Sequence, residues 1–156
     1  MPKKRVYILT DPAEEHFAKE LMRLLREVGE ESYGLELEFV HRNGLIEATP
    51  HIEEDSSTHF DLAIFSAVLA ESDRVTIDRC KGDPKPSLDG NSFSILPLMR
   101  RIKTSQPACT MIVACPLEHR AITIFMLSEE NNADWVFKPE TLSESQVALW
   151  IALFLV

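Results

Sequence analysis

Short apolar runs alternate with helix-like segments along this chain, and that alternation is the feature that most constrains its fold. The runs have the length and the β-branched and aromatic content of strands, and they cover residues 5–10, 35–40, 62–67, 110–115 and 135–137. Helical spacing of apolar residues, or a helix-start signal, fills most of the intervals between them. Such units form a parallel sheet, because each right-handed crossover lays its helix on the sheet. The sequence therefore predicts an α/β domain with helices on both faces of one sheet.

The polarity of each run predicts its place in the sheet. Residues 62–67 are largely apolar, which is typical of a central strand buried on both faces. Residues 35–40 alternate apolar and acidic side chains, which indicates an edge strand with one wet face. With the second strand at an edge and the first, third and fourth inside, the strand order is 2-1-3-4-5. We therefore predict a flavodoxin-like, doubly wound, five-stranded parallel sheet.

The helical segments differ in the strength of their signals. The first has one apolar stripe, made by Phe17, Leu21, Leu24, Leu25 and Val28. Between the second and third strands we predict only a weak helical turn around Leu45 and Ile46. A long polar loop over residues 70–91 follows the third strand, and Ser94 is then the predicted N-cap of a helix. The last helix is predicted to begin at a capping-box pattern that runs from Thr141 to Glu144.

Size, charge and cysteine content narrow the functional classes. The 156 residues predict a single domain, residues 1–156, and no apolar run reaches the roughly 20 residues that span a bilayer. The formal charge of −9 opposes binding to nucleic acid, because that affinity comes largely from neutralising phosphates. Three cysteines without a CxxC pair indicate no disulfide framework, which favours a cytoplasmic protein. No residue pattern indicates a metal site or a bound cofactor.

Candidate site residues lie where the predicted strands end. In doubly wound sheets, ligands bind beyond the carboxyl ends of the strands. The residues at those ends are Thr10, Asp11, Ser66, Ala114, Cys115 and Lys138.

Around these positions the chain resembles the receiver domain of bacterial response regulators. The segment 133–139, Ala-Asp-Trp-Val-Phe-Lys-Pro, is similar to the Gly-Ala-x-x-Tyr-x-x-Lys-Pro of that family. Asp11 after the first strand, the Asp89-Gly90 turn, the third strand over 61–65 and the helix over 98–103 add similarity at the level of pattern. The resemblance covers nearly the whole chain. It implies the same fold and a role in two-component signal transduction.

The resemblance also implies a role for each strand end. In the family, an Asp after the third strand accepts a phosphoryl group, and an acidic pair after the first strand helps to hold Mg²⁺. A Thr or Ser after the fourth strand contacts the phosphoryl group, and a Lys of the fifth strand pairs with that group. Here Asp11 matches one acid and Lys138 matches the Lys. Thr10 and Ser66 replace the other acid and the acceptor, and Ala114, or Cys115 on a one-residue shift, replaces the Thr or Ser. Because a serine hydroxyl cannot form an acyl phosphate, we expect a pseudo-receiver with no catalytic residue.

The segment 147–156 is apolar all round. A helix on a domain surface normally opposes polar residues to its apolar stripe, so this one should leave an apolar face that marks a contact. In the receiver family, the fourth helix, fifth strand and fifth helix build the usual dimer surface. We expect a homodimer through an interaction surface of Trp135, Phe137, Trp150, Ile151 and Phe154. Another signalling protein, or the output domain of a longer regulator, would be a further partner.

Two alternatives stay open. In the first, the chain is a working Mg²⁺-dependent receiver that is phosphorylated on a non-standard acid, although Asp61, Asp73 and the acids at 53–55 are poorly placed. In the second, it is an unrelated flavodoxin-like enzyme or small-molecule-binding protein. The sequence has no GxGxxG or GxxxxGK motif that would favour this reading.

Overall fold

The computed structural model of the chain describes residues 2–66, 95–114, 133–137 and 142–156. The strands are β1 (Lys3–Thr10), β2 (Glu36–Asn43), β3 (Leu62–Ser66), β4 (Thr110–Ala114) and β5 (Trp135–Phe137). The helices are α1 (Glu15–Tyr33), α2 (Leu45–Ala48), α3 (Ile52–Ser57), α5 (Leu96–Ser105) and α7 (Glu144–Leu155), with 3-10 turns η1 (Pro12–Glu14) and η2 (Thr49–His51).

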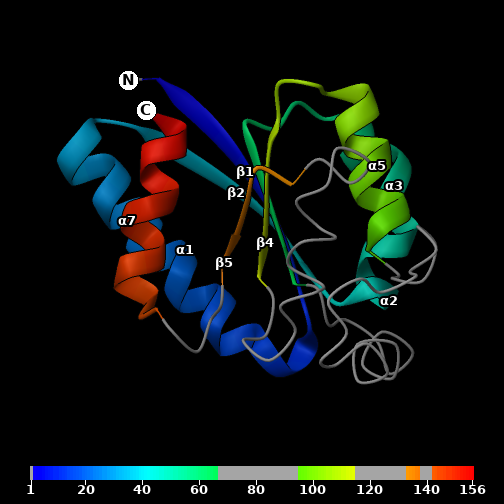
Figure 1. Ribbon diagram of the computed structural model, residues 1–156, viewed down its shortest axis with the longest axis horizontal. Helices are drawn as coiled ribbons and strands as arrows, with labels where there is room; N and C mark the ends of the chain where they lie inside the picture. Colours follow the sequence, from blue (N-terminus) through cyan, green and yellow to red (C-terminus); the bar gives the residue numbers. More distant parts are fainter. Residues whose placement is uncertain (1, 67–94, 115–132, 138–141) are drawn as a thin grey trace, which may run out of the picture.

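The strands form one five-stranded parallel sheet in the order β2-β1-β3-β4-β5, which confirms the predicted flavodoxin-like order (Figure 1). Strands β1, β3 and β4 lie inside the sheet, and every residue of β3 is buried. Strand β2 lies at one edge, as the alternation of Leu35, Leu37 and Phe39 with acidic residues predicted. The apolar pattern of the sequence therefore fixes each strand's position through burial.

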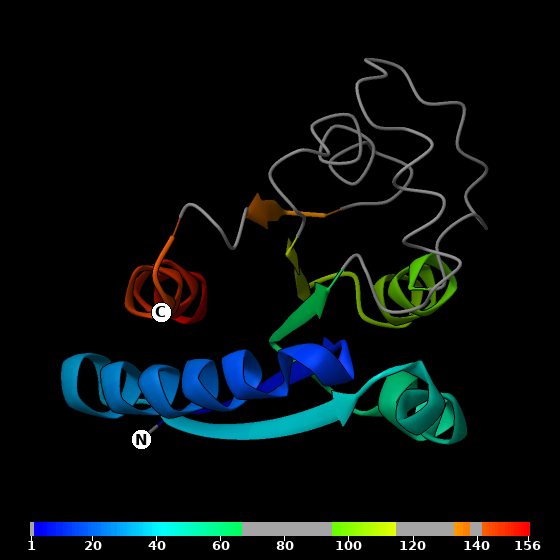
Figure 2. The same cartoon turned by 90° about the horizontal axis from the view of Figure 1, so that it is seen from below.

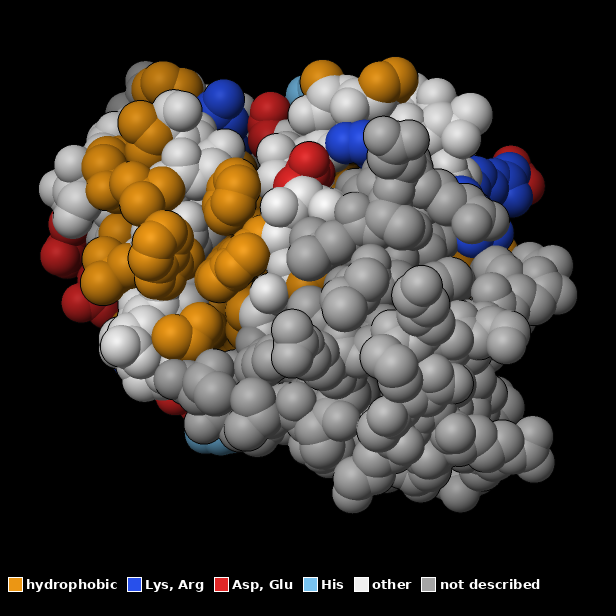
Figure 3. Space-filling model, viewed as in Figure 1, with side chains coloured by type: hydrophobic (Ala, Val, Ile, Leu, Met, Phe, Trp, Pro, Cys, Tyr) orange, Lys and Arg blue, Asp and Glu red, His pale blue; other side chains and the backbone are white. Residues whose placement is uncertain are grey.

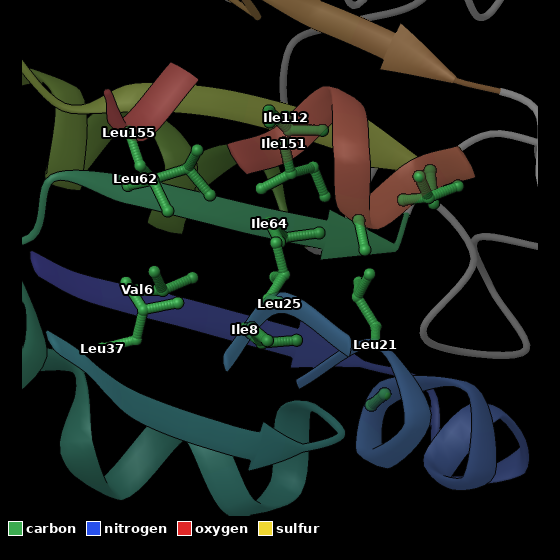
Figure 4. Packing of buried hydrophobic residues seen from close by; sticks show 14 of the residues in the cluster. Val6, Ile8, Leu21, Leu25, Leu37, Leu62, Ile64, Ile112, Ile151 and Leu155 are labelled. Carbon is green, nitrogen blue, oxygen red and sulfur yellow. The ribbon is translucent and has the colours of Figure 1, made fainter. Parts of the chain in front are cut away.

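Two layers of helices enclose the sheet (Figure 2). Helices α1 and α7 cover one face, where Leu21, Leu25, Ile151 and Leu155 pack against strand residues such as Ile64 (Figure 4). Helices α3 and α5 lie on the other face. The core there is made of Tyr7, Leu9, Phe60, Ala63, Phe65, Leu96, Met99, Ile102, Met111 and Val113, among others. Alternate residues of each strand thus serve opposite cores, as the two-residue period of a strand requires.

The segment between β2 and β3 is more helical than we predicted. Instead of one weak turn near Leu45, α2, η2 and α3 follow one another from Leu45 to Ser57. A buried ion pair fixes α3: the Arg42 guanidinium donates to both carboxylate oxygens of Asp55 at 2.9 Å each. Asp55 is 2% exposed, so loss of Arg42 would leave a buried side chain without this partner. The helical order of this segment thus comes from a tertiary contact.

The start of α7 also differs from the prediction. The N-cap is Ser143, whose hydroxyl accepts from the Gln146 N–H while the Gln146 side chain accepts from the Ser143 N–H. The capping box therefore lies two residues beyond the predicted Thr141–Glu144 pattern, in a stretch where both spacings are available. Thr141, the predicted cap Ser94 and the loop over 70–91 lie outside the described residues.

Side chains close the amino ends of three strands. The Arg5 N–H donates to Asp61 at 2.9 Å, and the Met111 N–H donates to Asp134 at 2.7 Å. The Gln106 amide accepts from the Phe60 N–H at 2.7 Å and donates to the carbonyls of Ser56 and Thr58. Backbone groups that a strand end would leave without partners are therefore paired at this edge.

Candidate functional site

The sheet brings the described candidate residues to one edge. Leu9 is paired with Phe65, so Thr10 and Ser66 follow at the carboxyl ends of adjacent strands, and Ser66 is paired with Ala114. Thr10, Ser66 and Ala114 are all buried. Cys115 and Lys138 lie outside the described residues. Thr10, Ser66 and Ala114 therefore lie at the carboxyl ends of three adjacent strands.

Thr10 is held by a residue that the sequence did not single out. Its hydroxyl forms a 3.0 Å hydrogen bond with Nε2 of His41, on the neighbouring strand β2. Burial lowers the pKa of His41, and this effect exceeds the opposing influence of Glu47 and Glu15. The imidazole is thereby favoured in its neutral form beside the threonine. A carboxylate at position 10 would instead raise that pKa.

Asp11 organises the chain that leaves β1. Its carboxylate accepts from the Ala13 N–H at 2.9 Å and so caps η1, with Pro12 at the first position of the turn. Gly44 lies against Pro12 with a φ of 94°, and a Cβ at this glycine would come within 3.0 Å of the proline ring. The ends of β1 and β2 thus pack together around a local cap.

Ser66 ends the central strand β3 and is 3% exposed. It presents a hydroxyl at this edge of the sheet, and its partner across the sheet, Ala114, contributes only a methyl group. Within the described ranges, no group of three His, Cys, Asp or Glu side chains is placed to hold a metal ion.

The outer side of α7 is a second candidate site. Leu149, Trp150, Leu153 and Phe154 are 53%, 55%, 56% and 41% exposed. The half-buried Trp135 of β5 adjoins them, with ring centroids 6.2 Å from Trp150 and 6.1 Å from Phe154. We call these five residues the α7 surface, and it belongs to the broad orange area on the left of Figure 3. Exposed apolar side chains gathered in this way are typical of an interaction site.

Two residues that we expected on this surface are in the core. Phe137 is 2% exposed and Ile151 is fully buried, and both pack in the cluster beneath α1 and α7. On the exposed α7 surface, Leu149 and Leu153 are present instead of Phe137 and Ile151. Helical geometry explains Ile151, because residues 147, 148, 151, 152 and 155 share the inner side of α7. Phe137 lies on β5, where its side chain packs in the core that α1 and α7 cover. From residue 147 to residue 155, α7 has no polar residue that would identify its inner side from sequence.

None of the described helices is long and apolar enough to cross a membrane.

Comparisons with known proteins identify the fold. No family model matches the chain, and no curated protein matches it either. Among solved structures, it is similar to a response regulator receiver domain protein from Clostridium thermocellum, with a TM-score of 0.56 and 14% identity over 99% of this chain and 94% of that one. It is also similar to a putative pilus assembly-related protein from Burkholderia pseudomallei, with a TM-score of 0.52 and 10% identity over 96% of this chain and 87% of that one. At these identities the similarity establishes the fold alone: a receiver-like, five-stranded parallel sheet flanked by helices.

Proposed function

We propose that this chain is a receiver-like signalling domain that acts by protein–protein contact and does not accept a phosphoryl group. The observation that carries the proposal is Ser66, a buried hydroxyl at the carboxyl end of the central strand. Phosphoryl transfer to an aspartate conserves a high-energy acyl phosphate, and a serine at that place cannot form one. Thr10, bonded to His41, and Asp11, which caps η1, support the same reading.

The contact proposed for signalling uses the α7 surface, with a second copy of the chain as the partner. Burying Leu149, Trp150, Leu153 and Phe154 would remove a large apolar area from water, at about 25 cal/mol for each Å². Such a contact needs no phosphoryl group to form. Another signalling protein, or an output domain, is the other partner that the test below distinguishes.

An NMR titration tests the first half of the proposal. With Mg²⁺ and then beryllofluoride, a mimic of the aspartyl phosphate, we expect the amide signals of Asp11 and Ser66 to stay in place. Ser66→Asp restores a carboxylate and should make the same amides respond to Mg²⁺, whereas the uncharged Ser66→Asn should not. A joint shift of both amides in the unaltered chain would favour the working-receiver alternative.

Sedimentation of surface variants tests the second half. Trp150→Glu places a charge in the centre of the α7 surface, and we expect it to abolish association through that surface. Gln146→Glu is the matched control, because it adds the same charge to α7 and keeps the capping box. If Trp150→Glu leaves the assembly of the chain unchanged, the α7 surface binds some other protein or none.

A further inference from the structure

We draw no further inference here: the strongest candidate, the side-chain cluster of Thr10 and His41 at the carboxyl edge of the sheet, belongs to the site already described, and its hydrogen bond forms with neutral or protonated imidazole alike.

Discussion

Helices α1 and α7 lie side by side on the same face of the sheet, yet only their inner sides are alike. Both bury aliphatic residues in one core, Leu21 and Leu25 from α1 and Ile151 and Leu155 from α7. The outer side of α1 carries ion pairs such as Arg23–Glu27, whereas α7 carries the α7 surface. Since α1 shows that a helix in this layer can have a charged outer side, the fold does not require the outer leucines and aromatics of α7. They call for another explanation, and intermolecular contact is the one that we propose.

The largest loss of stability is expected for substitutions on the inner sides of α1 and α7, where the two helices are alike. Ile151→Ala and Leu25→Ala each remove a fully buried side chain, and each should lower the free energy of unfolding by about 2–5 kcal/mol. Denaturant unfolding measures this. A cost well below 1 kcal/mol for Ile151→Ala would mean that α7 is not part of the core, and the comparison with α1 would fail.

A smaller loss of stability is expected for a substitution at the helix N-terminus, where α1 and α7 differ. Ser143 caps α7 with its side chain, whereas the N-cap of α1, Glu14, makes no such bond. Ser143→Ala should therefore cost about 1 kcal/mol of unfolding free energy, and Ser143→Asp, which keeps a capping oxygen, should cost clearly less. Thermal unfolding of both variants decides the point, and equal losses would contradict it.

The ion pairs on the outer side of α1 should contribute still less. Arg23 bonds to Glu20 and Glu27, which holds the pKa of Glu20 below its usual value. The side chains of Arg23 and Glu27 are exposed and that of Glu20 is partly exposed, so Arg23→Ala should lower the unfolding temperature only slightly, and added salt should remove the difference. A loss that persists in high salt would indicate packing by the arginine stem instead.

The smallest effect on the folded monomer is expected on the α7 surface. Leu153 is 56% exposed, so Leu153→Gln should change the free energy of unfolding by less than about 0.5 kcal/mol at low protein concentration. Self-association, measured by light scattering, should weaken in the same variant. A large loss of monomer stability would show that the outer side of α7 is covered within the chain itself.

The strand order could be predicted from the sequence because the burial of a strand determines its pattern of apolar and polar residues. The acids Glu36 and Glu38 marked the edge strand, and the apolar run of β3 marked the centre. The carboxyl ends of parallel strands lie at one edge of a sheet, so the sequence alone was enough to assign Thr10, Ser66 and Ala114 to the same edge.

Contacts between distant residues were not predictable in the same way. The helical segment α2–α3 contains Pro50 and several Ser and Thr residues, and Arg42 holds it through Asp55, 13 residues away. The bond between Thr10 and His41 spans 31 residues. Neither partner carries a local pattern that identifies the other, since hydrogen bonds between strands and helices depend on the assembled sheet.

The side chains at the two ends of the sheet have different roles in the structure. At the amino ends, Asp61, Gln106 and Asp134 bind backbone N–H groups and join neighbouring elements. None of these bonds involves Thr10, Asp11 or Ser66. Side chains at the carboxyl ends can therefore be exchanged over evolutionary time without loosening this anchorage. A sheet anchored at one end can keep its architecture while the chemistry at its other end is replaced.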